Sequence, residues 1–170
     1  MSRGLDLNSP PFRMNSRHAI PEELGRFVAR FDGGEYWLAH EELERLWLRE
    51  RDEFSKGLIH LAAGLLHARR GNWRGAHAKI SSARALIDIA SPKVPGVRLE
   101  ELRDALEELC NVASARLAGD GEGSSLVADL KLAPFFPAGA AADVEPVELP
   151  YRVRRHAAGY RPGRDPRRRD

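Results

Sequence analysis

The sequence predicts an all-α protein, an antiparallel bundle of about five helices, and three observations carry this prediction. Apolar residues recur at helical spacing from residue 21 to about residue 118. The connections at 33–34, 50–51 and 71–72 are short, so consecutive helices have to pack antiparallel. No strand pattern is evident before residue 126. An irregular, partly disordered extension is expected after the bundle, because Gly, Pro and Arg dominate there.

Each expected helix has its own start or stop signal. The five are expected over residues 21–33, 35–49, 52–70, 72–90 and 99–117. Asn72 suits the N-cap of the fourth helix, since its side chain can accept a backbone N–H. The third helix has leucines on one side and Gly57 and Gly64 on another. Glycine inside a helix costs about 1 kcal/mol relative to alanine, so this stripe predicts a central helix that a neighbour approaches closely.

The 170 residues divide into four parts: a mobile leader (1–20), the helical bundle (21–118), a Gly/Pro-rich linker or strap (119–150) and a basic disordered tail (151–170). The tail has eight Arg and two Asp, a net charge of +6, which leaves −4 for residues 1–150 of the total of +2. No apolar run reaches the roughly 18 residues of a membrane span, so no membrane association is expected. The lone Cys110 agrees with a cytoplasmic setting.

One stripe of the second helix combines aromatic and ionisable side chains. Trp37, His40, Glu44 and Trp47 lie within about 80° of one another on a helix of 3.6 residues per turn, and Glu41 is next to His40. Glu42, Arg45 and Arg49 fall toward the opposite side, and the three tryptophans, Trp73 included, are expected to pack in the core. If the following turn centres near residue 50, His60 lies level with His40, so the stripe predicts a polar cluster between two helices.

Two interpretations of this cluster stay open. In the first, His40, Glu41, Glu44, His60 and Asn72 form hydrogen bonds across helices and fix their register, because buried polar groups need partners. In the second, His40, Glu44 and His60 bind a divalent transition metal and leave an open coordination position. Neither histidine follows a glutamate by three residues, as a di-iron bundle would require. Nucleophilic hydrolase motifs and phosphate-binding glycine loops are absent from the sequence.

Three segments in a fixed order resemble the domain-of-unknown-function 309 family. They are Phe31-x-x-Gly34-x-Tyr36-Trp37-x-Ala39-His40-Glu41-x-Leu43-Glu44-x-x-Trp47, then Phe54-x-x-Gly57-Leu58-Ile59-x-Leu61-Ala62-Ala63, then Gly71-Asn72-Trp73-x-Gly75-Ala76. The resemblance covers about residues 24–110 and implies a small all-helical bacterial or archaeal domain with no established biochemical role. The family usually has glutamine at the position of His60, which disfavours the three-ligand metal site.

The sequence therefore supports three functional hypotheses. The preferred one is a non-enzymatic interaction or assembly module without a cofactor, which binds an unknown protein partner or itself, with Tyr36, Trp37, Trp47 and Trp73 supporting its polar cluster. The first alternative is a metal-dependent, hydrolase-like enzyme that uses the His40 and Glu44 face. The second is nucleic-acid contact through the charge of the tail, whose candidate residues are Arg152, Arg154, Arg155, Arg167, Arg168 and Arg169.

Overall fold

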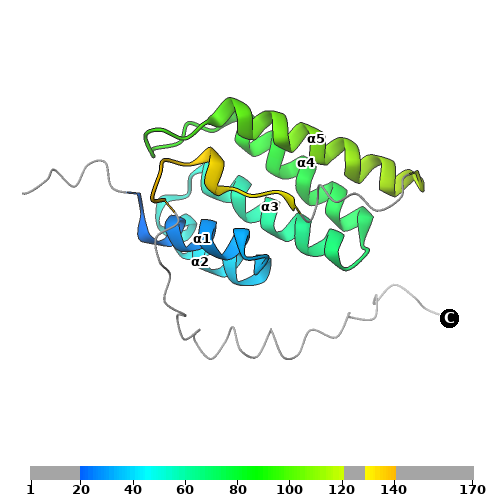
Figure 1. Ribbon diagram of the computed structural model, residues 1–170, viewed down its shortest axis with the longest axis horizontal. Coiled ribbons are helices and arrows are strands. Elements are labelled where there is room, and N and C mark those ends of the chain that lie inside the picture. Colours follow the sequence, from blue (N-terminus) through cyan, green and yellow to red (C-terminus); the bar gives the residue numbers. More distant parts are fainter. Residues whose placement is uncertain (1–19, 121–128, 141–170) are drawn as a thin grey trace, which may run out of the picture.

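The computed structural model describes residues 20–120 and 129–140, and over these residues the chain is entirely helical, with no strand (Figure 1). The helices are α1 (Glu22–Asp32), α2 (Tyr36–Glu50), α3 (Glu53–Arg69), α4 (Trp73–Ile89), α5 (Leu99–Ala118) and the short 3₁₀ helix η2 (Ala133–Phe135). The predicted all-α fold is confirmed, and the predicted helix bounds differ from these by at most one residue. The expected leader and basic tail lie outside the described residues.

The helix ends follow the local chemistry of the sequence. Asp52 caps α3 by accepting a hydrogen bond from the Ser55 backbone N–H at 2.8 Å. Asn72 caps α4 in the same way, with its Oδ1 2.9 Å from the Gly75 nitrogen. Gly71 in the connection before α4 has φ +72°, a left-handed conformation that glycine adopts without a steric penalty. The predicted N-cap at Asn72 is thus confirmed.

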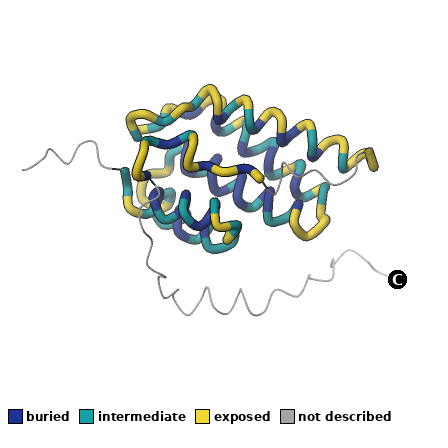
Figure 2. The backbone as a smooth tube through the Cα atoms, viewed as in Figure 1, coloured by how far each residue is buried: buried dark blue, intermediate teal, exposed yellow. Residues whose placement is uncertain are grey.

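Helix α3 is the central helix, as its two-sided pattern predicted, because it packs against both α2 and α4. A Cβ atom added at Gly64 would lie 2.7 Å from Ile80 Cγ1 and 3.2 Å from the Ile80 nitrogen. A Cβ atom at Gly57 would lie 2.8 Å from the end of the Ile87 side chain. The two glycines therefore bring α4 close to α3. Figure 2 shows buried residues on the sides of the helices that face one another.

A strap, residues 129–140, returns across the bundle after α5. Figure 1 shows it, in yellow and orange, crossing between α1 and the pair of α4 and α5. Its Leu130, Leu132, Phe136 and Ala140 are buried in the same core as the helices. The strap expected within residues 119–150 therefore packs on the bundle over these twelve residues, and residues 133–135 form η2.

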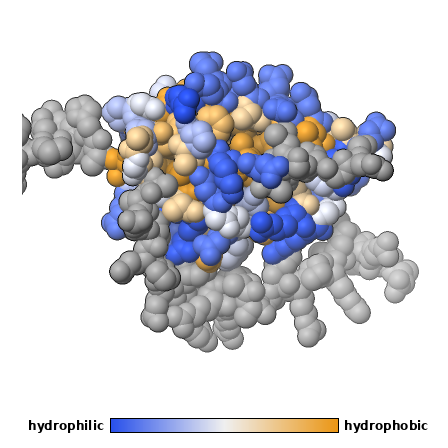
Figure 3. All heavy atoms as spheres, in the orientation of Figure 1, coloured by the Kyte–Doolittle hydropathy of each residue, from blue (hydrophilic) through white to orange (hydrophobic). Residues whose placement is uncertain are grey.

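Among the described helices, none has the length and apolar character needed to cross a membrane. Cys110 is buried on α5, and burial raises the pKa of its thiol. The outer side of α5 is hydrophilic, as the upper edge of the molecule in Figure 3 shows.

Candidate functional site

Helix α2 faces the core with a different side from the stripe that the sequence singled out. Its fully buried apolar side chains are Tyr36, Ala39, Leu43 and Leu46. Trp37, His40, Glu41, Glu44 and Trp47 are all half-buried and lie beside this core side; we call these five residues the α2 face. The tryptophans Trp37 and Trp47 were expected in the core; both are half-buried, and Trp47 packs against the core from outside.

Three ionisable side chains of the α2 face come together. One ligand atom from each of His40, Glu41 and Glu44 can be chosen so that all three lie within 4.8 Å of one another. His40 Nδ1 lies 3.4 Å from Glu41 Oε1, and the two side chains are 25% and 20% exposed. The i and i+4 spacing of His40 and Glu44 on one helix explains why they reach the same point.

Two polar atoms of the α2 face are buried without a hydrogen-bond partner among the described residues. They are His40 Nδ1, which is near Glu41 but poorly oriented toward it, and Trp37 Nε1. The two rings stack on each other with an interplanar angle of 3° and a centroid separation of 5.9 Å. Because buried polar atoms normally have partners, these two atoms are the positions on the α2 face where water or another molecule could bind.

His60 is held by a different contact from the one predicted. Its Nδ1 lies 2.8 Å from the Ser82 hydroxyl of α4, and His60 is not among the ligand atoms grouped with His40. Burial is the first cause that lowers the pKa of His60, followed by the nearby charges of Lys79 and Lys56. His60 therefore bridges α3 to α4.

Asn72 likewise belongs to a separate contact, at the turn between α3 and α4. Its amide nitrogen lies 3.1 Å from His67 Nδ1, while its amide oxygen accepts the Gly75 N–H. Gly75 lets these side chains approach, because a Cβ there would lie 2.8 Å from His67 Nδ1. The structure therefore divides the predicted cluster into three contacts: the His40 group, His60 with Ser82, and His67 with Asn72.

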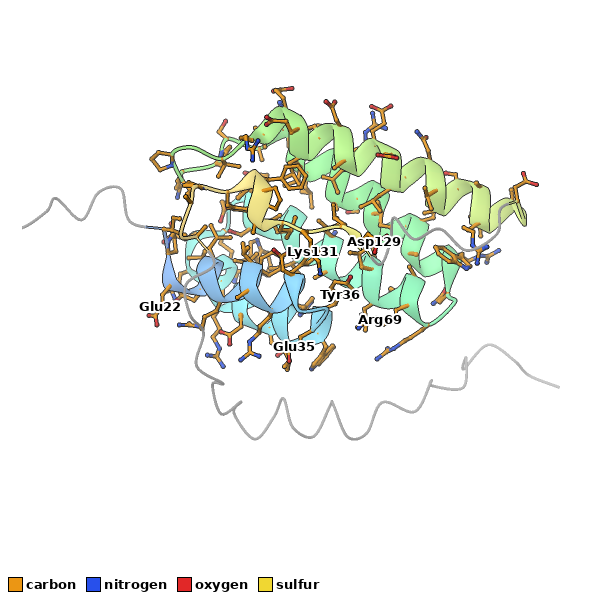
Figure 4. All side chains as sticks on the ribbon, viewed as in Figure 1. Glu22, Glu35, Tyr36, Arg69, Asp129 and Lys131 are labelled. Atoms are coloured by element: carbon orange, nitrogen blue, oxygen red, sulfur yellow. The ribbon has the colours of Figure 1, made fainter. Side chains whose placement is uncertain are left out.

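The other aromatic residues of the prediction pair with cations. Arg51 and Lys56 lie over the Trp47 ring at 4.6 and 5.7 Å from its centroid. Arg69 lies 4.9 Å from the Tyr36 ring and Arg116 4.8 Å from the Trp73 ring. Figure 4 labels Arg69 and Tyr36, which lie side by side below α3. Trp73, expected in the core, is only partly buried and packs against its edge. Such contacts between cations and aromatic faces contribute about 0.5–1 kcal/mol each where they are exposed.

Sequence reasoning missed a buried charge, Glu42, which was expected on the side of α2 away from the polar stripe. It is 1% exposed, and its two carboxylate oxygens lie 3.0 Å from Arg26 Nε and 3.3 Å from Arg30 Nε. Burial opposes the charge of Arg26, but the hydrogen bond and charge of Glu42 outweigh it and raise the pKa of Arg26. The sequence holds one signal for this contact: Arg26 and Arg30 are four residues apart on α1, and the next helix carries Glu42.

Together, the fold and this site define a small helical-bundle domain with an aromatic and His/Glu face beside its core. Residues 24–78, from α1 into α4, match the model of the family described as a domain of unknown function (DUF309). The predicted resemblance is confirmed over these residues, although its expected extent to about 110 is not matched. Comparison with curated proteins and with solved structures gives no significant match. The arginines proposed for nucleic-acid contact lie outside the described residues.

Proposed function

We propose that the domain is a non-enzymatic assembly module that pairs with a second copy of itself through the α2 face. The observation that carries the proposal is the pair of buried polar atoms, Trp37 Nε1 and His40 Nδ1, that have no hydrogen-bond partner within residues 20–120 and 129–140. A partner surface would satisfy both atoms if it placed an acceptor at the Trp37 N–H and a polar group at His40 Nδ1. Aromatic residues and arginine are also the residue types that dominate binding energy at interfaces.

The distribution of charge along α2 supports pairing between two identical copies of the α2 face. Glu41 and Glu44 lie near the middle of the helix, and Arg51 and Lys56 gather around Trp47 at its carboxyl end. When two copies of α2 pack antiparallel about a twofold axis near Trp47, the acidic part of each faces the basic end of the other. A twofold interface of this kind uses one patch twice, which is the commonest symmetry of oligomers.

Sedimentation of the full chain over a concentration series tests this proposal. The wild type is expected to gain mass toward a dimer, and Trp47→Ala to weaken the association at least tenfold, equivalent to about 1.4 kcal/mol. Trp73→Ala is the matched control, because it also removes a tryptophan that stacks on an arginine, but off the α2 face. A wild-type chain that stays monomeric at its highest soluble concentration, or equal weakening by both substitutions, contradicts the proposal.

A second candidate, a divalent transition-metal site, is favoured by the close approach of the His40, Glu41 and Glu44 ligand atoms. One imidazole and two carboxylates are a donor set that zinc, iron(II) and manganese accept. His40 Nδ1 lacks a hydrogen-bond partner within the described residues, which leaves its lone pair available for a metal in the matching tautomer. Three protein ligands leave open coordination positions, which is the arrangement of catalytic zinc sites, and a bound metal would supply an activated water there.

Metal titration of the full chain purified without a histidine tag tests the second candidate. Calorimetry with Zn²⁺, Mn²⁺ and Fe²⁺ is expected to show one site that Glu44→Gln weakens. Glu107→Gln on α5 is the control, because it removes a carboxylate outside the cluster. The absence of heat and of any melting shift with all three ions contradicts a metal site and leaves the assembly proposal unaffected.

A further inference from the structure

A cavity lies at the end of the bundle where the start of α1, the end of α2, the start of α3 and the connection between α4 and α5 meet. Figure 1 shows the start of α1 and the connection from α4 to α5 at the same end of the molecule. The volume of the cavity is about 290 Å³, close to the lower limit of pockets that hold small organic ligands. We call it the end cavity and define it by these residues of its wall: Leu24, Leu46, Arg49, Asp52, Phe54 and Lys93.

The most buried side chains of the end cavity are apolar. Leu24, Leu46 and Phe54 are 2%, 6% and 4% exposed, and each belongs to the hydrophobic core. Val94, from the connection between α4 and α5, also lines the cavity and packs against that core. Because three helices and a connection supply these side chains, an apolar group that enters the cavity loses its contact with water on several sides. The end cavity therefore suits a ligand with an apolar part.

Charged side chains of both signs line the same cavity. Arg49 and Lys93 are the cations, and Glu50 and Asp52 are the carboxylates. Arg49 Nη1 lies 2.7 Å from Glu23 Oε1. Lys93 Nζ lies 3.0 Å from Glu50 Oε2, and the side chains of both cations are more than half exposed. Exposed ion pairs contribute little to stability, and each of these pairs occupies only part of the donors of its cation, so both cations can still bind an anionic group.

Asp52 and Ser55 supply acceptor groups at the start of α3. Asp52 caps the helix through Oδ1, which accepts the Ser55 backbone N–H at 2.8 Å. This contact uses one of the two carboxylate oxygens and leaves Oδ2 for a second donor. Ser55 lines the cavity although the residue is only 4% exposed, so a hydroxyl lies within one helical turn of the carboxylate. An ammonium group in the end cavity therefore finds two acceptors there, a carboxylate oxygen and a hydroxyl oxygen.

We propose that the end cavity binds an apolar α-amino acid. The apolar side chain of the ligand lies against Leu24, Leu46 and Phe54. Its carboxylate is bound by the two cations of the wall, since the guanidinium of Arg49 can donate two parallel hydrogen bonds to one carboxylate. Its ammonium group is bound by Asp52. The end cavity places both signs of charge beside one apolar wall, which is the pattern that a zwitterion with one apolar substituent requires.

Two simpler ligand classes fit these charges less well. An apolar carboxylic acid brings an anion near Glu50 and Asp52 without offering either of them a cation. An apolar amine brings a cation near Arg49 and Lys93, which carry the same charge. No residue of the α2 face lines the end cavity, so this inference does not depend on the assembly proposed above.

NMR titration of the full chain tests the class of ligand. L-leucine and L-phenylalanine are the probes, and each is compared with the acid that lacks its amino group and the amine that lacks its carboxyl group. We expect the better amino acid to bind with a Kd below about 1 mM and at least tenfold more tightly than either of its two analogues. Binding of the acid or the amine as tight as that of the amino acid overturns the proposal, and so does the absence of binding by both amino acids.

Asp52→Asn separates recognition of the ammonium group from recognition of the carboxylate. Asparagine caps a helix as well as aspartate does but carries no charge. This variant should weaken binding of the amino acid at least tenfold without weakening binding of the acid that lacks the amino group, whereas Arg49→Gln should weaken both. Glu53→Gln and Arg45→Gln are the matched controls, because they remove the same charges at positions of α3 and α2 that do not line the cavity. Wild-type affinity of the Asp52→Asn chain for the amino acid, or equal weakening by Glu53→Gln, overturns the proposal.

Discussion

Arg30 and Glu42 form a buried ion pair between α1 and α2, with 3.3 Å between Arg30 Nε and Glu42 Oε1. Arg30 is 8% exposed and also lies 3.0 Å from Glu35, just before α2. Because Arg26 shares the same carboxylate, Glu42 is the common partner of two cations. This arrangement fixes how α1 lies on α2, and so positions the half-buried face beside it.

Removing the carboxylate is expected to destabilise the fold strongly. Glu42→Ala leaves two guanidinium groups partly desolvated without their partner, and breaking a buried pair in this way costs about 3–5 kcal/mol. Glu50→Ala is the control, because it removes an exposed ion pair with Lys93 and should cost under about 1 kcal/mol. Urea unfolding followed by circular dichroism gives both values. Equal costs for the two substitutions would show that the pair does not hold the helices together.

Glu42 also shows where sequence reasoning stops. The periodicity of α2 placed this residue away from the polar stripe, and that placement is correct, but it does not reveal which helix covers the far side. The Glu42 side of α2 is buried because α1 packs against it and places arginines there from two successive turns. Sequence patterns identify faces, whereas the neighbour of each face depends on tertiary packing.

Features that depend on nearby residues were predicted correctly from the sequence, whereas contacts between distant residues were not predicted. The cap at Asn72 and the glycine approach at Gly64 were predicted because both depend on nearby sequence or on one helix neighbour. The split of His60 from His40 could not be predicted, because Ser82 lies on α4 and competes for the imidazole. The Asp32 carboxylate accepts hydrogen bonds from the backbone of Leu132 and Ala133 in the strap. These residues are about 100 positions apart, and the sequence alone holds no signal for such a contact.

The two close-packed glycines are both expected to resist replacement by alanine. At Gly64 the new Cβ meets Ile80 Cγ1 at 2.7 Å and the Ile80 backbone nitrogen at 3.2 Å. At Gly57 it meets the completely buried Ile87 side chain at 2.8 Å and the Ala83 carbonyl oxygen at 3.3 Å. Overpacking costs about 1–3 kcal/mol, whereas alanine regains about 1 kcal/mol of helix propensity. Gly64→Ala and Gly57→Ala should therefore each lower the melting temperature in thermal unfolding, and a higher melting temperature for both variants would refute close packing of α3 against α4.

The stability of the domain is expected to fall on mild acidification. Burial is the first cause that lowers the pKa values of His60 and His67, followed by nearby cations, Lys79 among them. The unfolded histidines have the higher pKa, near 6.5, so the unfolded state binds more protons below that pH. The contribution of both residues is complete above pH 6.5 and is lost as the pH falls through their folded pKa values. Urea unfolding at pH 7.5 and pH 5.5 measures the loss.

A variant with both His60→Gln and His67→Gln is the control for this pH dependence. Glutamine keeps hydrogen-bonding capacity but does not titrate, so the variant should lose a smaller part of its unfolding free energy between the two pH values. An equal slope in the double variant and the wild type would assign the acid sensitivity to other groups.

The contact between Asn72 and His67 defines the tautomer of the neutral imidazole. The Asn72 oxygen accepts the Gly75 N–H, so its nitrogen faces His67 and can only donate. His67 Nδ1 must accept that hydrogen bond, which places the proton of the neutral ring on Nε2. Asn72→Ala removes this bond and the cap together and is expected to cost about 1 kcal/mol in urea unfolding.

Asn72→Asp separates the two roles of Asn72. One carboxylate oxygen can still cap Gly75, but the other now faces His67 Nδ1 and favours a proton there. The pKa of His67, lowered in the wild type, is therefore expected to rise in this variant, which NMR titration of the ring carbon proton measures. With the folded pKa raised above the unfolded one, His67 then adds stability at low pH and loses it as the pH rises. A His67 pKa that stays at its wild-type position would mean that the ring and residue 72 are not in contact in solution.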